Sequence, residues 1–273
     1  MNIAQALAQA HGLGLDRLEA QTLVLHALGR DVHDRAWLLL HDVDELSADV
    51  VDKFHAVVQR RLQHEPLAYL TGFQDFHGLT LQTDARALVP RPDTETLVDW
   101  ALSLGLAQAQ VLDLGTGSGA IALALKHARP AWQVSAVDAS DEALQLAHLN
   151  AQRYQLDVAF VYSDWLASVI GEFDLIVANP PYIAEGDPHL QALPSEPRMA
   201  LVSGLDGLDA IRHIIQEAPK HLHSGAWLLL EHGFDQAPQV CALLEKHGFL
   251  QVQSRVDLAG ISRCSGGCWP EVK

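Results

Sequence analysis

From about residue 110 onward, short apolar runs alternate with longer amphipathic runs, and this alternation restricts the fold more than any other feature of the chain. The apolar runs are typical of buried strands, and the runs between them have the three- and four-residue spacing of helices. Such alternation predicts an α/β, doubly wound domain, in which helices cover both faces of a mainly parallel sheet. We predict strands at 110–114, 133–137, 157–162, 173–178, 226–231, 249–256 and near 261–269, and helices near 118–128, 140–153, 206–221 and 236–247.

A glycine-rich turn follows the first of these strands. Gly115, Gly117 and Gly119 alternate with Thr116 and Ser118, a G-x-G-x-G spacing that differs from the G-x-G-x-x-G of dinucleotide-binding proteins. Glycine lets the backbone turn sharply and lets a ligand approach the N–H groups closely. A turn of this kind alone is compatible with a plain tight turn.

The second strand ends in Asp138, whose carboxylate is placed to accept hydrogen bonds from ribose hydroxyls. Strand, glycines, helix, strand and acid together predict a site for a nucleoside-type cofactor.

The fourth strand runs into the tetrapeptide Asn179-Pro180-Pro181-Tyr182. An Asn side chain offers one carbonyl acceptor and one amide donor, the prolines fix the backbone, and Tyr adds a flat face. These groups suit a planar, poorly nucleophilic nitrogen, which must be held rigidly before it can take an alkyl group. The alternative is that the two prolines only terminate a strand.

Four polar segments each follow a predicted strand. In parallel sheets, ligands bind outside the carboxyl ends of the strands. We therefore expect these segments to meet at one edge of the sheet: Gly115 to Gly119, Asp138, Ser163 to Trp165, and Asn179 to Tyr182.

The first part of the chain has a different pattern. Residues 1–71 have helical spacing without a strong strand, residues 72–89 contain short extended pieces typical of a hairpin linker, and residues 90–273 form the α/β domain. Between linker and domain, Thr94 and Glu95 begin a helix. They either cap this helix or contact a ligand.

Composition favours a soluble, cytoplasmic protein. The chain has 273 residues, 49% of them hydrophobic, and no apolar stretch approaches the ~20 residues of a membrane span. Three cysteines are too few for a disulfide framework, and no spacing indicates a metal site. The formal net charge of −16 makes nucleic acid a disfavoured partner, since repulsion would weaken binding to phosphates.

Taken together, the motifs resemble those of the peptide chain release factor glutamine methyltransferases, and the resemblance covers nearly the whole chain. Besides the glycine-rich turn and the tetrapeptide, it is carried by residues 65–72 (EPLAYLTG), 88–95 (LVPRPDTE), 196–201 (EPRMAL), 204–208 (GLDGL) and 257–260 (DLAG). The stretch from Cys264 to Cys268 departs from the family pattern and puts only the packing of the last strand in doubt.

The resemblance implies a fold and an activity. The fold is a small all-α N-terminal domain that helps to recognise the protein substrate, followed by a hairpin and a seven-stranded class I methyltransferase (Rossmann-like) domain whose last strand is antiparallel. The cofactor is S-adenosylmethionine, which leaves as S-adenosylhomocysteine. Its methyl group goes to N5 of the glutamine in the Gly-Gly-Gln motif of release factors, in support of translation termination.

The resemblance also implies roles for individual residues. The turn from Gly115 to Gly119 would wrap the methionine part of the cofactor, Asp138 would bind its ribose, and Trp165 would lie near the adenine. Asn179 and the Pro180 carbonyl would accept from the glutamine NH2, while Tyr182 packs on the amide plane and Pro181 completes the substrate site.

The long segment between the fourth and fifth strands is expected to line the substrate mouth, with Glu196 and Arg198 in contact with substrate. Three alternatives remain: a methyltransferase acting on glutamine in a ribosomal protein, one acting on the adenine amine of nucleic acid, and an inactive cofactor-binding scaffold.

Overall fold

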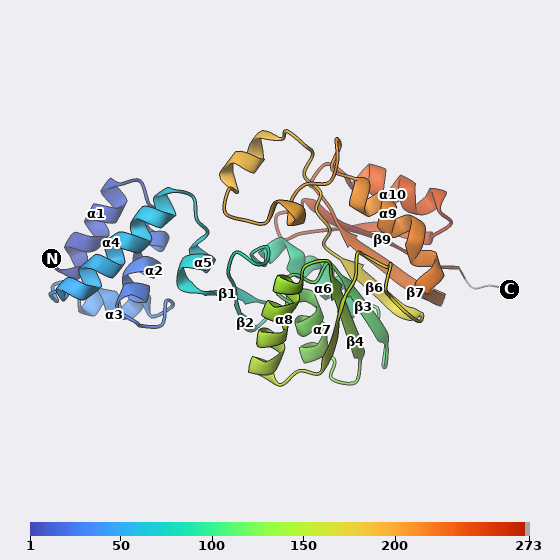
Figure 1. Cartoon of the computed structure of the whole chain (residues 1–273), viewed down its shortest axis with the longest axis horizontal. Helices are drawn as coiled ribbons and strands as arrows, with labels where there is room; N and C mark the ends of the chain where they lie inside the picture. The colour runs from blue at the N-terminus through green and yellow to red at the C-terminus, as the bar shows by residue number, and fades with distance from the viewer. Residues whose placement is uncertain (271–273) are drawn as a thin grey trace. The chain divides into compact units, whose positions relative to one another are not determined.

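A computed structural model describes residues 1–270, which separate into two compact units (Figure 1). The smaller unit contains Met1–Gly72 and Ala192–Ser195, and the larger contains Phe73–Gln191 and the chain from Glu196 onward. The hairpin after residue 72 belongs to the larger unit in this division. The three-part division expected from the sequence stays a prediction.

The smaller unit is helical. Asn2 and Asp16 begin its first two helices with capping boxes, in which the side chain accepts a hydrogen bond from a backbone N–H in the first turn. Leu23, Leu25 and Phe54 are fully buried where the helices meet. The helices are α1 (Ile3–Gly12), α2 (Arg17–Ala27), α3 (Arg35–Leu40), α4 (Ala48–Leu62) and α5 (Leu67–Thr71).

The larger unit begins with a hairpin of β1 (Phe73–Phe76) and β2 (Leu79–Gln82). His77 and Gly78, between the strands, both have positive φ, which matches the twist of a two-residue hairpin turn. The short helix η1 (Pro92–Thr94) and helix α6 (Glu95–Ser103) follow. The Glu95 carboxylate accepts a hydrogen bond from the His77 backbone N–H at 2.9 Å and so ties α6 to the hairpin.

A seven-stranded sheet forms the centre of the larger unit, in the order β5-β4-β3-β6-β7-β9-β8. Strand β9 runs antiparallel to both of its neighbours, and the other adjacent pairs are parallel. The predicted fold class is therefore confirmed. The strands are β3 (Gln110–Leu114), β4 (Gln133–Asp138), β5 (Val158–Tyr162), β6 (Phe173–Ala178), β7 (Leu222–Glu231), β8 (Leu250–Val256) and β9 (Ser262–Cys268).

Helices cover both faces of this sheet (Figure 1). Along β6, Leu175 and Val177 face the core under α6, α7 (Ala120–Ala128) and α8 (Asp141–Tyr154). Ile176 and Ala178 face the core under α9 (Asp209–Glu217) and α10 (Ala237–Lys246). A strand buried on both faces explains the continuous apolar runs in the sequence. Across residues 1–270, none of the helices has the length and apolar character needed to cross a bilayer.

The segment between β6 and β7 has more structure than the sequence indicated. It contains the short helices η2 (Pro188–Ala192) and η3 (Arg198–Ala200). The Ile183 N–H donates to the Leu201 carbonyl at 2.9 Å, and the Ser203 N–H donates to the Ile183 carbonyl at 2.9 Å. These bonds close the segment into a loop whose two ends lie together.

Asn150 joins three parts of the larger unit and provides a test of its stability. Its fully buried amide accepts from the Gln82 N–H and donates to the Gln82 and Ser118 carbonyls, at 2.7, 3.0 and 2.9 Å. Asn150→Ala would leave these backbone groups without partners and should lower the free energy of unfolding by about 2 to 4 kcal/mol in urea denaturation. Gln152→Ala, an exposed amide on the same helix, should change it by less than about 0.5 kcal/mol.

Candidate active site

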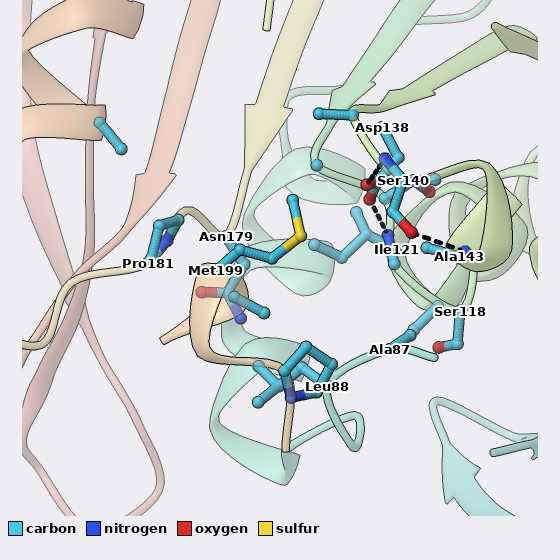
Figure 2. A pocket seen from close by; sticks show the side chains of 18 of the residues that line it. Ala87, Leu88, Ser118, Ile121, Asp138, Ser140, Ala143, Asn179, Pro181 and Met199 are labelled. Atoms are coloured by element: carbon cyan, nitrogen blue, oxygen red, sulfur yellow. Dashed lines mark hydrogen bonds between the residues drawn. The ribbon is translucent and has the colours of Figure 1, made fainter. Parts of the chain in front are cut away.

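A cavity of about 590 Å³ opens at the carboxyl ends of β3, β4 and β6 (Figure 2). It is lined by most of the residues predicted to bind the cofactor and by half of the tetrapeptide. The predicted residues in its wall are Gly115, Thr116, Gly117, Ser118, Asp138, Trp165, Asn179 and Pro181. The remaining predicted residues, Gly119, Pro180, Tyr182, Glu196 and Arg198, are not in its wall.

The glycine-rich turn forms one side of the cavity. Its first two N–H groups, from Gly115 and Thr116, both donate to the Val137 carbonyl at 2.9 Å, which fixes the turn against the end of β4. Gly115 has φ +68, and a Cβ there would lie 3.2 Å from the Trp165 ring. A side chain at Gly115 would therefore strain the backbone and require the indole to move by a few tenths of an ångström.

Asp138 ends β4 and supports the same turn. One of its carboxylate oxygens accepts from the Gly117 N–H at 2.8 Å and the other from the Ser140 N–H at 2.9 Å. Burial raises the pKa of Asp138, and these hydrogen bonds oppose the rise. The carboxylate faces the cavity as well (Figure 2), so it both holds the turn and is available to a ligand.

Asp113 is a buried acid whose role the sequence pattern did not indicate. Its Oδ2 accepts from the Thr116 hydroxyl at 2.6 Å and from the Ala122 N–H at 3.2 Å, whereas Oδ1 has no partner among residues 1–270. Burial raises the pKa of Asp113 to about 7, and the Thr116 hydrogen bond opposes this shift. Its position directly before the glycine-rich turn is the signal that could have identified it.

The tetrapeptide follows β6, and its first residue is held from the side. The Asn179 amide Nδ2 donates to the Thr94 hydroxyl at 3.1 Å. The Asn179 amide oxygen makes no hydrogen bond within the described part of the chain, and Asn179 lies in the cavity wall (Figure 2). Thr94 makes no side-chain cap on α6. Its hydroxyl instead orients Asn179.

The tetrapeptide is also fixed at its other end. The Tyr182 carbonyl accepts from the Gln236 side-chain amide at 3.1 Å, and a Cβ at Gly207 would lie only 2.2 Å from this oxygen. Gly207 therefore permits a close approach that any other residue would block. Burial, and secondarily the Glu231 carboxyl, raise the pKa of Tyr182. Between these two ends, Pro180 is buried.

The segment after η2 contributes to the cavity, although the two residues expected to touch substrate do not line it. Its wall includes Pro197, Met199, Ala200, Val202 and Ser203. The Glu196 carboxylate points into the protein, where it pairs with Arg91 and accepts from the Val89 N–H at 3.1 Å. Arg198 is exposed.

No cluster of three or more His, Cys, Asp or Glu side chains within residues 1–270 is arranged to hold a metal ion.

Comparison with known proteins gives matches over nearly the whole chain. Residues 1–72 match the family described as "PrmC N-terminal domain", and residues 94–196 match "Methyltransferase small domain". The release factor glutamine methyltransferase of Xylella fastidiosa is 45% identical over 97% of this chain and 98% of its own. That of Pseudomonas aeruginosa is 45% identical over 93% of this chain and 92% of its own.

Solved structures resemble the larger part of the chain. A methyltransferase from Pyrococcus furiosus has a TM-score of 0.54 and 21% identity, with coverage of 71% of this chain and 90% of that one. A 16S rRNA methyltransferase from T. thermophilus, in complex with AdoMet and guanosine, has a TM-score of 0.52 and 20% identity. The match covers 72% of this chain and 49% of that one. At these identities the likeness concerns the fold.

The Asp113 carboxyl predicts a pH-dependent change in stability. Its pKa is about 7 in the folded chain and 3.8 ordinarily, so folding favours the neutral form. Its stabilising contribution is complete below pH 3.8 and is lost as the pH rises to about 7. Asp113→Asn should therefore raise the free energy of unfolding relative to wild type by about 2 kcal/mol more at pH 7 than at pH 5.

Urea denaturation at several pH values measures this difference. Asp157→Asn, the same substitution at an exposed position, serves as the control. If the free energy of unfolding changes with pH in the same way for wild type and Asp113→Asn, the buried acid is not neutral in the folded state.

Proposed function

Because the chain belongs to the release factor glutamine methyltransferase family, we propose that it transfers a methyl group from S-adenosylmethionine to the side-chain amide of a release factor glutamine. The glutamine is that of the Gly-Gly-Gln motif, and the reaction supports translation termination in the cytoplasm. The observation that carries this proposal is the Asn179 side chain, which lies in the cavity wall with its amide nitrogen held by Thr94.

The residues in the wall fit S-adenosylmethionine. Gly115, Thr116, Gly117 and Ser118 offer a backbone surface to the methionine part, and the Asp138 carboxylate is available to the ribose hydroxyls. Trp165 provides a flat apolar face suited to an adenine. The cofactor, when bound, supplies an electrophilic methyl group on a positively charged sulfur.

The chain's own contribution is to orient the glutamine amide. With Nδ2 engaged by Thr94, the Asn179 oxygen is left to accept one N–H of the substrate amide. The Pro180 carbonyl is the expected acceptor for the other N–H. Two acceptors hold the nitrogen in one orientation, so positioning and exclusion of water supply the catalysis and no strong base is needed. Tyr182 and Pro181 would confine the amide plane.

Protein is favoured over nucleic acid as the substrate. The formal net charge of −16 would repel a phosphate backbone, and it places no such penalty on a protein substrate. A ribosomal protein remains the closest alternative. Incubation with labelled S-adenosylmethionine and each candidate substrate, followed by mass mapping of the labelled residue, separates these possibilities. Label on the Gly-Gly-Gln glutamine would support the proposal, and label only on a ribosomal protein or nucleic acid would overturn it.

Asn179→Ala tests the orientation of the amide. Loss of the acceptor should reduce methyl transfer to a release factor by more than about 100-fold, because the substrate nitrogen is no longer held in line. Binding of S-adenosylmethionine, measured by calorimetry, should change by less than about threefold, since most of the predicted cofactor contacts remain. Gln191→Ala, an exposed amide in the segment after β6, is the matched control and should keep wild-type turnover. Near-normal turnover of Asn179→Ala would remove Asn179 from the mechanism.

Arg198 tests whether the segment around η3 meets the release factor. Its exposed side chain is open to trypsin in the free protein. We expect saturating release factor to slow cleavage after Arg198 about tenfold or more, because a bound substrate would cover it. Cleavage after Lys246, exposed at the end of α10, reports any general change in protease activity. If release factor slows cleavage equally at Arg198 and Lys246, or slows it at neither site, a docking role for this segment would be contradicted.

A further inference from the structure

We infer that Glu231 and Thr94 form a positioning pair that determines which end of the Asn179 amide faces the substrate. This inference rests on the proposed function and assigns to it two residues that need not touch the glutamine. Glu231 is the last residue of β7, and Thr94 is the last residue of η1.

Strand register brings the pair to Asn179. Ala178 of β6 lies opposite Leu230 of β7, so Asn179 and Glu231 follow neighbouring positions of two paired strands. Thr94 is only 4% exposed and accepts from Asn179 Nδ2 at 3.1 Å. Its hydroxyl is also close enough to the Glu231 carboxyl to favour the charged form of that group. Glu231 is 1% exposed, and its Oε2 has no partner among residues 1–270.

The ability of a hydroxyl both to donate and to accept explains how the pair would orient the Asn179 amide. A threonine hydroxyl donates one hydrogen and accepts through its lone pairs. When Glu231 is a carboxylate, it can only accept, so the Thr94 hydrogen is directed to it. The Thr94 oxygen then receives a hydrogen from the Asn179 NH2, and the Asn179 oxygen stays on the cavity side. When Glu231 is protonated, it can donate to Thr94, whose hydrogen is free to meet a reversed Asn179 amide.

The groups around Glu231 determine its charge in solution. Burial raises the pKa of Glu231 to about 7, and Asp93 adds to the rise. Three groups oppose this rise in pKa because they favour the carboxylate: the Thr94 and Tyr182 hydroxyls and the Arg263 guanidinium. Arg263 of β9 is shared, since it pairs with Asp93 at 2.9 Å and with Asp257 at 3.1 Å.

Cys264, opposite Glu231 on β9, has a thiol whose pKa is raised by burial, so it adds no charge near pH 7. The carboxylate of Glu231 therefore predominates at pH 8, and the acid predominates at pH 6.

The test measures single-turnover methyl transfer to a release factor between pH 6 and 8, with both substrates saturating. The wild-type rate should rise about tenfold over this range as Glu231 ionises. Glu231→Gln should be about tenfold slower at pH 8 and nearly independent of pH, because a side-chain amide cannot change charge. Its KM for S-adenosylmethionine should be unchanged. The Asp113→Asn variant identifies any contribution from the other acid whose pKa is near 7.

Thr94 provides a second pair of variants that does not depend on folding of Glu231→Gln. Thr94→Val removes the hydroxyl with little change of shape and should lower the rate about tenfold. Thr94→Ser keeps the hydroxyl and should stay within about threefold of wild type with the same pH profile. A role in which Thr94 only fills space would not distinguish these two substitutions by the presence of a hydroxyl, and the pH profile separates the pair from a hydrogen bond that serves stability alone.

The outcomes separate this inference from the proposed function. Failure of the wild-type protein to label a release factor glutamine would overturn the proposed function itself. Normal labelling by wild type, with Glu231→Gln retaining the wild-type rate and pH profile, would overturn only the positioning pair. Equal losses in Thr94→Ser and Thr94→Val would overturn it too.

Discussion

Parallel pairing of β3 with β4 and β6 is the constraint on which the site depends. Leu114 lies opposite Val137 on one side and Ala178 on the other, so the three strands reach the same edge of the sheet together. The next residues along each strand are Gly115, Asp138 and Asn179. Main-chain hydrogen bonds thus place the glycine-rich turn, an acid and the tetrapeptide beside one cavity, before any side chain contributes. A shift of register would separate these groups.

Besides Asp138, two almost completely inaccessible carboxyls stand at this edge, and their environments give them different roles. Asp113 lies under the glycine-rich turn, and Glu231 lies beside the tetrapeptide. Burial raises the pKa of each to about 7. A buried acid without a full set of hydrogen-bond partners lowers the stability of the fold. Such a residue is therefore expected where its contacts serve the function of a site. Here Asp113 accepts from Thr116 in the turn. We assign Glu231 to the orientation of Asn179.

Local sequence patterns predicted the fold well, because strand ends and turns depend mainly on residues that are close together in the sequence. The alternation of apolar and amphipathic runs gave the sheet and its helices, and the antiparallel last strand followed from the family resemblance. Strand β7 begins at Leu222, earlier than expected, because a register shift against β6 lets its first residue pair with Phe173. The predicted helix at 206–221 is divided into α9 and a short helix that contains Pro219, since proline disrupts a regular helix.

Contacts between distant residues could not be predicted in this way. Thr94 and Asn179 are separated by 85 positions, and only the folded chain shows that their side chains meet. Whether Thr94 capped a helix or served the site was left open by its position at the start of a helix. Likewise, the acidic character of Glu196 is compatible with a substrate contact until Arg91 and Val89 are found around it. The direction of a side chain depends on its partners, and partners that are distant in the sequence cannot be recognised from local patterns.

The tetrapeptide combines stiffness within its backbone with support at both ends. The prolines fix two φ angles and remove two N–H groups that would otherwise require acceptors near the cavity. Thr94 holds the Asn179 side chain, while Gln236 and the absence of a Cβ at Gly207 hold the Tyr182 carbonyl. A weakly nucleophilic amide gains reactivity mainly from being held in one orientation, and a segment prepared in this way loses little entropy when it binds. The surrounding supports are therefore as much a part of the site as the residues that line it.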